Sequence, residues 1–393
     1  MNYKNNINMD NNSIGVVEEH DFSFGSCEDD SLKLDCGKCL YPVNIRYETY
    51  GVLNQEKNNA ILIIHALTGN AHAAGYHNKS DRKPGWWNQM IGPGKAFDTD
   101  KYFIVCSNSL GGCSGTTGPR SINPKTKKRY NMTFPIITIA DMVRAQHKLM
   151  KYLEIPKWLS IVGGSMGGME ALQWSIDYPD LSTSIIAIAT TAYLSPQAIA
   201  FDWVGREAIK SDPNWQEGEY ENSVPEKGLA TARMLAHITY LSDKSMDAKF
   251  GRKLRDKAIF KNSFSRNFEV ENYLDYQGHS FVERFDANCY LYITRAMDYF
   301  DLSEKNNGDL SESIKKIKSD FLVMSFSSDW LFPPESSKKI VKALRSNSID
   351  VVYCNIESNY GHDAFLLEVE TMSSLISDFL ATRFILERNI HDK

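Results

Sequence analysis

Residues 161–174 read Ile-Val-Gly-Gly-Ser-Met-Gly-Gly-Met-Glu-Ala-Leu-Gln-Trp, so an apolar strand pattern meets a helical pattern at a Gly-x-Ser-x-Gly motif. Glycines two positions before and two after Ser165 lack the Cβ atoms that would clash in a sharp strand-to-helix turn. Such a nucleophile elbow holds the serine hydroxyl above a parallel sheet, where N–H groups at the helix N-terminus can stabilise an oxyanion. The alternative is a glycine-rich turn with an incidental serine. The adjacent Gly164 and Gly168 and the strand–helix context favour the elbow.

Length and composition place the chain among soluble globular proteins. Its 393 residues suit one large domain with an insertion, and 42% hydrophobic and 24% charged residues are ordinary values. A net charge of −5 shows no excess of positive charge of the kind that nucleic-acid-binding proteins carry. No apolar run approaches the roughly 18 residues of a membrane span. Seven cysteines without regular spacing are typical of free thiols in a reducing compartment. We therefore expect a cytoplasmic protein that binds neither nucleic acid nor membrane.

The order of strand-like and helix-like segments predicts the fold class. Apolar strand runs lie at residues 60–67, 102–106, 159–162, 184–189, 321–326 and 351–356, and residues 137–152 show helical spacing. This alternation predicts an α/β fold with a mostly parallel central sheet. Residues 193–304 are helical in pattern and lack strand runs, so we expect a helical lid inserted into a core made of 16–192 and 305–385. Residues 1–15 are Asn-rich without a signal-peptide core, and we expect a disordered tail there.

Two pairs of residues raise the question of a metal. Cys36 and Cys39 lack further ligands, and alternation at 32–34 and 43–47 indicates a hairpin that turns at Gly37. His65 and His72 also lack a visible third ligand, so packing or loop roles are favoured. The sequence therefore predicts no metal site.

A catalytic serine needs a base, usually a histidine that a carboxylate orients. In this architecture the acid and then the histidine follow the serine along the chain. Of nine histidines, only His362 and His391 lie late enough, and His391 is among the last three residues. His362 follows the strand run at 351–356, on the edge where open α/β sheets place their sites. We expect His362 to be the base.

The acid should also leave the end of a strand. Asp329 follows the strand run at 321–326 and precedes two prolines that end the segment. A helix-capping role is the alternative for Asp329, and Asp298 and Asp301 are weaker rivals because their contexts are helical or turn-like. We expect Asp329 to orient the base.

Two backbone N–H groups are expected to form an oxyanion hole. One belongs to Met166, directly after the nucleophile, and the other to Leu67, after an early strand. Each donor would contribute on the order of 10²–10³ in rate.

Several longer motifs carry a family resemblance. They are Tyr-Glu-Thr-Tyr-Gly at 47–51, His-Ala-Leu-Thr-Gly at 65–69, Arg-Lys-Pro-Gly-Trp-Trp at 82–87, Ile-Gly-Pro-Gly-Lys at 91–95, Gly-Gly-Cys-Ser-Gly-Thr-Thr-Gly-Pro at 111–119, the elbow, Phe-Asp-Ala-Asn at 285–288, Ser-Asp-Trp at 328–330 and Tyr-Gly-His-Asp-Ala-Phe at 360–365. Over about residues 30–385 the chain resembles the bacterial-type homoserine O-acetyltransferases, which have the α/β-hydrolase fold. The resemblance implies ping-pong transfer of an acetyl group from acetyl-CoA to L-homoserine in methionine biosynthesis. It also implies no cofactor beyond acetyl-CoA as co-substrate, and a cytoplasmic homodimer that pairs through the lid helices.

The resemblance also assigns residues. The family's nucleophile, acid and base match Ser165, Asp329 and His362. Its carboxylate-binding arginine matches Arg206 and its ammonium-binding aspartate matches Asp363, since a guanidinium can hold a carboxylate bidentately. For Arg206 the alternative is a solvated helix residue paired with a neighbouring glutamate.

Departures from the family pattern leave the substrates open. Asp202-Trp203, Glu207 and Asn359 differ from the residues common in the family, and they fall on the acceptor side. Succinyl-CoA as donor or serine as acceptor are therefore alternatives, as is a simple esterase or thioesterase. A non-catalytic interaction protein is disfavoured because the three triad residues occur in order. The basic run 125–129 could meet CoA phosphates, but a solvated loop is favoured.

Overall fold

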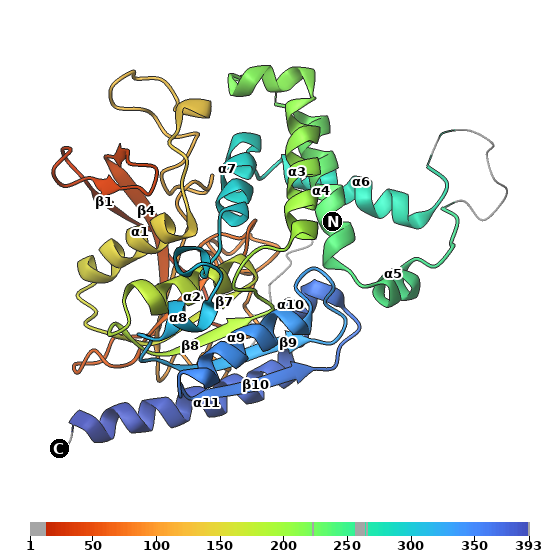
Figure 1. Ribbon diagram of the computed structural model, residues 1–393. Coiled ribbons are helices and arrows are strands. Elements are labelled where there is room, and N and C mark those ends of the chain that lie inside the picture. Colours follow the sequence, from red (N-terminus) through yellow and green to blue (C-terminus); the bar gives the residue numbers. More distant parts are fainter. Residues whose placement is uncertain (1–12, 222–223, 256–263, 265, 392–393) are drawn as a thin grey trace.

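A computed structural model describes residues 13–221, 224–255, 264 and 266–391. Its centre is an eight-stranded sheet in the order β1–β4–β6–β5–β7–β8–β9–β10, accompanied by a β2–β3 pair (Figure 1). The strands are β1 (His20–Phe24), β2 (Leu32–Lys33), β3 (Cys39–Leu40), β4 (Val43–Tyr50), β5 (Ala60–Ile64), β6 (Phe103–Ser107), β7 (Trp158–Gly164), β8 (Ser182–Ile188), β9 (Asp320–Phe326) and β10 (Val351–Ile356). Strand pairs from β6 to β10 are parallel, and only the β1–β4–β6 edge is antiparallel. The predicted α/β class with a mostly parallel sheet is confirmed.

Helices follow the strands as the sequence predicts. They are α1 (Ile139–Tyr152), α2 (Met166–Asp177), α3 (Pro196–Lys210), α4 (Glu226–Tyr240), α5 (Asp243–Lys249), α6 (Glu269–Val282), α7 (Ala287–Asp298), α8 (Leu310–Ile314), α9 (Pro334–Ser346), α10 (Ala364–Leu367) and α11 (Val369–His391), with short 3₁₀ turns η1 (Asn131–Thr133), η2 (Pro213–Gly218), η3 (Glu304–Asn306) and η4 (Gly361–Asp363). Helix α1 begins at a capping box, in which the Thr138 side chain accepts from the Asp141 N–H and the Asp141 side chain accepts from the Thr138 N–H. Among the described residues, no helix combines the length and hydrophobicity needed to span a bilayer.

Both faces of the sheet are covered. All five residues of β5 are buried, and alternate side chains point to opposite faces. Leu62 and Ile64 join a core that includes residues of α1 and α2, whereas Ile61 and Ile63 join a second core that includes residues of α11. Burial on both faces explains why this strand appears in the sequence as a continuous apolar run.

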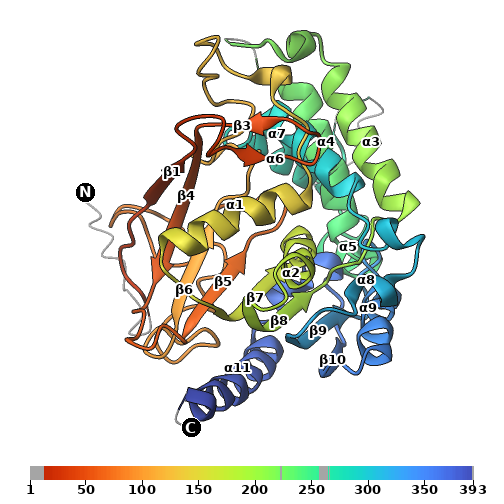
Figure 2. The same cartoon turned by 60° about the vertical axis from the view of Figure 1, so that its left-hand side comes forward.

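A helical segment separates β8 from β9. In both views α3, α4, α6 and α7 lie together above the sheet (Figures 1 and 2). The chain leaves and re-enters the core at one place, because the Leu302 N–H donates to the Ala192 carbonyl at 3.0 Å and the Leu194 N–H donates to the Phe300 carbonyl at 3.3 Å. The described part of 193–304 contains no named strand. Its role as a lid stays a prediction.

The N-terminal third differs from the prediction in its strand pairing. The hairpin does turn at Gly37, with φ +79°, but β2 pairs with the two-residue β3 rather than with 43–47. Pro42 follows β3 and has no N–H to continue the ladder. Strand β4 pairs instead with β6 and with β1, which the sequence analysis missed. The predicted tail falls mainly on residues 1–12, outside the described residues, and the Gly15 carbonyl accepts from the Tyr76 N–H at 3.0 Å.

Candidate active site

The elbow is a sharp turn between β7 and α2. Ser165 sits at the N-cap of α2 with φ 57° and ψ −121°, a conformation that side chains rarely adopt. A Cβ added to Gly163 would lie 2.0 Å from the Gly167 carbonyl oxygen, and one added to Gly167 would lie 2.3 Å from the Ile64 carbonyl oxygen. The backbones therefore approach too closely for any other residue at these two positions.

Ser165, His362 and Asp329 form one hydrogen-bonded chain. His362 Nε2 lies 2.8 Å from Ser165 Oγ, and His362 Nδ1 lies 2.7 Å from Asp329 Oδ2. The other carboxylate oxygen of Asp329 accepts the N–H groups of Leu331 and Phe332 at 3.0 and 2.9 Å, which fixes the orientation of the carboxylate. All three triad side chains are buried, from three loops at the carboxyl ends of β7, β9 and β10. This is the arrangement that lets a histidine remove the serine proton while an aspartate holds its tautomer.

The pKa of His362 sets an expected pH dependence. Burial would lower this pKa, but the charge of Asp329 and its hydrogen bond outweigh burial and raise the pKa above the ordinary 6.5. A base acts only when neutral, so kcat/KM for the acyl donor should fall as pH decreases through a value above 6.5. In Asp329→Asn, burial dominates, and the acid limb should move to lower pH while the maximal rate drops by about 10⁴-fold. A pH–rate profile of both proteins measures this, and an unmoved limb would contradict the role of Asp329.

The expected oxyanion donors lie beside the nucleophile. Met166 is the first residue of α2, where helix N–H groups lack intrahelical acceptors, and Leu67 lines the same cavity as Ser165. His65 supports the Leu67 loop: its Nδ1 lies 2.8 Å from the Ala66 carbonyl, and its Nε2 accepts the Ser109 N–H at 3.1 Å. Burial lowers the pKa of His65 to about 4, so it is neutral at pH 7 and can serve as donor on one side and acceptor on the other.

A cavity opens above Ser165 between the core and the helical segment. It is lined by Leu67, Ser165, Leu194, Ala198, Phe201, Asp202, Leu235, Ala236, Thr239, Tyr240, Tyr290, Met297, Leu331 and Phe332. Within the described chain, no lysine or arginine is part of this lining. Its only acidic side chain is Asp202, whose pKa burial and the charge of Asp298 raise to about 8. The cavity is therefore largely apolar and close to neutral at pH 7.

Arg206 is not among the residues that line this cavity. Its guanidinium forms a buried ion pair with Asp298, which also accepts from Arg295 Nη1 at 3.3 Å. Arg206 and Trp203 line a separate surface cavity. The other residues that line it come mainly from η1, α3 and α7. The geometry thus gives no support to the expectation that Arg206 holds a substrate carboxylate beside Ser165.

Two other arginines converge on the loop after β5. Arg233 Nη1 donates to Thr68 Oγ1 at 3.1 Å, and Arg284 Nη1 donates to the Thr68 carbonyl at 3.0 Å. Both guanidiniums lie against the Phe281 ring, at 4.7 and 5.2 Å from its centroid. Neither forms an ion pair with a carboxylate of the described residues, and Nε of Arg233 is buried without a partner. Burial and the charge of Arg233 lower the pKa of Arg284. The pair places two positive charges beside Thr68, which follows Leu67 in the chain.

Comparison with known proteins identifies the family. A family model described as alpha/beta hydrolase fold matches residues 59–369. A homoserine O-acetyltransferase from Methanohalobium evestigatum is 55% identical over 381 residues, which cover 97% of this chain and 76% of that protein. The chain belongs to the homoserine O-acetyltransferase family. A crystal structure of homoserine O-acetyltransferase from Bacillus anthracis matches with a TM-score of 0.86 at 29% identity, over 93% of this chain and 98% of that one.

Relatives of homoserine O-acetyltransferases include other acyl chemistries. A homoserine O-succinyltransferase from Alkalilimnicola ehrlichii is 52% identical over 357 residues, covering 90% of this chain and 92% of that protein. The crystal structure of esterase E22 matches with a TM-score of 0.85 at 30% identity, over 93% of this chain and 100% of that one. The choice of donor and acceptor must therefore be argued from the side chains around Ser165.

Sequence reasoning missed Arg233, although α4 carries a signal for it. The buried positions Leu229, Ala232 and Ala236 form one helical stripe, and Arg233 falls within it. An arginine on an otherwise apolar helical face needs a partner or a ligand when buried. Asp363, the expected ammonium ligand, follows His362 in η4. Burial raises the pKa of Asp363, and the charges of His362 and Arg233 oppose the rise, which indicates that Arg233 and Asp363 are near each other.

Proposed function

We propose that this chain transfers an acetyl group from acetyl-CoA to the hydroxyl of L-homoserine, a step in methionine biosynthesis, through an acetyl-Ser165 intermediate. The observation that carries the proposal is the Ser165–His362–Asp329 chain, with both hydrogen bonds at 2.8 Å or less. The 55% identity to a homoserine O-acetyltransferase supports the substrates.

In the first half-reaction, His362 Nε2 takes the proton of Ser165 Oγ as this oxygen attacks the thioester carbonyl. The N–H groups of Met166 and Leu67 stabilise the negative oxygen of the tetrahedral intermediate. When the carbon–sulfur bond breaks, the CoA sulfur leaves with the proton from His362. The products are free CoA and acetyl-Ser165.

In the second half-reaction, the homoserine hydroxyl gives its proton to His362 Nε2 and attacks the acetyl carbonyl. The same two N–H groups hold the oxyanion. The bond to Ser165 Oγ breaks, and Oγ recovers the proton from His362. Acetyl-CoA enters as a co-substrate, and each step is assigned to a side chain or backbone group of this chain, without a further cofactor. Transfer outcompetes hydrolysis if the helical lid at 193–304 excludes water from the cavity.

For the acceptor we propose Arg233, rather than Arg206, as the main carboxylate ligand, with Arg284 beside it. Arg206 is already ion-paired with Asp298, whereas Arg233 and Arg284 have no carboxylate ion-pair partner among the described side chains. Asp363, close to both Arg233 and the catalytic His362, is the proposed ligand of the ammonium group. A substrate with one carboxylate and one ammonium would then lie between the two charges.

The donor we propose is the acetyl rather than the succinyl thioester. A succinyl group brings a second carboxylate, which needs a cation in the acyl pocket. The cavity beside Ser165 offers Asp202 and apolar side chains, and no cation among its described lining residues. A negative acyl tail is thus disfavoured there.

A thiol-release assay that crosses both donors with both acceptors tests the function. We expect acetyl-CoA with homoserine to give the fastest steady-state release, and succinyl-CoA or serine to lower kcat/KM by about 10-fold or more. A rate that homoserine does not change would instead indicate a thioesterase. A faster rate with succinyl-CoA would contradict the argument from the cavity.

We further propose that the protein works in the cytoplasm as a homodimer through its lid helices. All seven cysteines are free thiols, in keeping with a reducing compartment. On α3, Trp203 and Val204 are 48% and 53% exposed, and Ile238 on the adjacent α4 is 40% exposed. Sedimentation equilibrium should give twice the chain mass, and Val204→Asp should shift the protein towards monomer. A monomeric wild type at micromolar concentration would contradict this proposal.

A further inference from the structure

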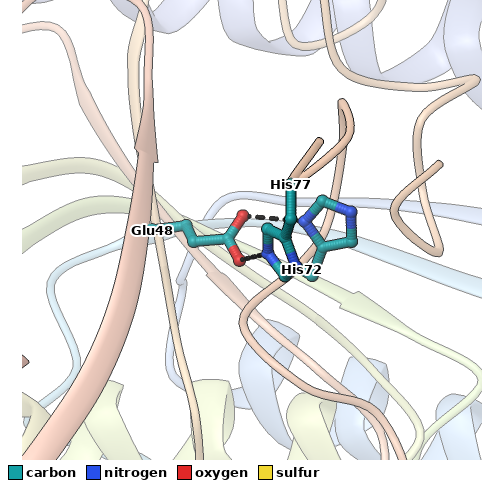
Figure 3. A group of neighbouring side chains, drawn as sticks. All are labelled: Glu48, His72 and His77. Atoms are coloured by element: carbon teal, nitrogen blue, oxygen red, sulfur yellow. Dashed lines mark hydrogen bonds and ion pairs between the residues drawn. The ribbon is translucent and has the colours of Figure 1, made fainter. Parts of the chain in front are cut away.

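A buried carboxylate on β4 holds two histidines outside the triad. Glu48 Oε2 lies 3.0 Å from His72 Nδ1, and Glu48 Oε1 lies 2.8 Å from His77 Nε2 (Figure 3). One ligand atom from each residue lies within 4.8 Å of the other two. We propose that Glu48, His72 and His77 form a binding site for a divalent metal ion of the zinc class.

The chemistry of the three donors selects this class of ion. Two imidazoles and one carboxylate suit zinc and its neighbours rather than calcium or magnesium, which prefer oxygen ligands. In a tetrahedral zinc site with bonds of about 2.0–2.2 Å, neighbouring ligand atoms are about 3.3 Å apart. The two histidine nitrogens lie 3.0 and 2.8 Å from different oxygens of Glu48, and one ligand atom from each residue lies within 4.8 Å of the other two, so the side chains need to shift to bring three donors to this spacing.

The surroundings hold the three groups in place. The Tyr50 hydroxyl lies 2.8 Å from Glu48 Oε2 and accepts the Ala73 N–H at 2.8 Å, so it ties the segment after β5 to β4. Asn108 Oδ1 accepts the Ala71 N–H at 2.7 Å from the other side. Partners of this kind orient metal ligands and reduce the ordering needed on binding.

An ion can enter from the side of His77. The His77 side chain is 38% exposed and that of His72 14%, whereas that of Glu48 is 1% exposed. Three protein ligands leave a fourth position for water. On binding, His72 Nδ1 and His77 Nε2 present lone pairs, and in each neutral ring the proton moves to the other nitrogen. No oxidation or reduction is involved.

The site shares no residue with the triad or with the proposed acceptor ligands. Its two histidines lie on the segment that begins at His65 and carries Leu67, so an ion there would tie this segment to Glu48 on β4. The sequence analysis expected no metal because it paired His72 with His65. In the structure His65 contacts Ser109 and Ala66, and His72 contacts Glu48.

Titration of the chelator-treated full-length protein with zinc chloride tests the inference. We expect one zinc ion per chain with a Kd of about 1 µM or lower, and a thermal midpoint that rises with zinc concentration. His77→Ala and Glu48→Gln should weaken binding by at least about 100-fold. His279→Ala is the matched control, because His279 is 72% exposed beside a single carboxylate of Asp275, and it should bind as the wild type does.

A spectroscopic readout on the wild type keeps the test independent of the variants. Cobalt(II) added to the metal-free protein should give the intense visible bands of a four-coordinate ion with nitrogen and oxygen ligands. Two outcomes would overturn the proposal. One is that no zinc binds when the free zinc concentration is 10-fold above about 1 µM. The other is that the wild type and His77→Ala bind zinc with equal affinity. Glu48 would then be a buried carboxylate that the two histidines satisfy by hydrogen bonds alone.

Discussion

Ser165→Ala is expected to lower steady-state thiol release from acetyl-CoA by at least about 10⁴-fold, because the serine oxygen is the atom that accepts the acetyl group. The burst of free CoA that precedes steady state should disappear completely. Alanine removes only Oγ, and the turn is held by the close backbone contacts of Gly163 and Gly167, so the thermal midpoint should stay near that of the wild type. Stopped-flow thiol detection and thermal unfolding provide the two measurements.

Ser346→Ala supplies a matched control for this experiment. Ser346 is exposed on α9, and its hydroxyl donates only to the Lys342 carbonyl one turn earlier. It should keep both the burst and the steady-state rate. A burst that survives in Ser165→Ala would show that another group accepts the acetyl unit.

Arg233→Met is expected to lower kcat/KM for homoserine by roughly 10- to 100-fold, the effect of losing one charge-assisted hydrogen-bonded contact. In a ping-pong reaction kcat/KM for each substrate reports its own half-reaction, so kcat/KM for acetyl-CoA should change far less. Arg233→Lys keeps the positive charge but lacks the planar guanidinium, so its kcat/KM for homoserine should lie between those of the wild type and Arg233→Met. Initial rates over a grid of both substrates separate these parameters.

Arg206→Met provides the contrasting variant. It leaves the buried Asp298 carboxylate without its closest cation, so the free energy of unfolding should fall by about 3–5 kcal/mol. The folded enzyme should keep its kcat/KM for homoserine. If kcat/KM for homoserine instead falls selectively in Arg206→Met and not in Arg233→Met, the family-based assignment of Arg206 is correct.

The fold and the triad geometry were accessible from sequence because they depend on local patterns. The elbow needs glycines at fixed spacing around Ser165, and buried parallel strands such as β5 are continuous apolar runs. His362 and Asp329 could be chosen because the chain order of such sites and their place at strand ends are fixed by topology. The same reasoning located the helical segment between β8 and β9 from the absence of strand runs.

Contacts between distant segments were not accessible in this way. Whether Arg206 on α3 is paired depends on α7, because its ion pair with Asp298 spans 92 residues. The convergence of Arg233 and Arg284 on Thr68 needs the helical segment between β8 and β9 to be packed against the loop after β5. The Glu48–His72–His77 cluster likewise requires β4 to be placed in the sheet. The two-residue strands β2 and β3 are too short for a clear period, and β1 has no fully buried position that would mark it as an apolar run.

The most direct test is intact-mass spectrometry of the protein quenched after mixing with acetyl-CoA alone, followed by peptide mapping. We expect one added acetyl group per chain, located on Ser165 and removed when L-homoserine is supplied before the quench. Absence of the adduct under rapid acid quench, or an acetyl group on a different residue that homoserine discharges, would contradict the proposed mechanism.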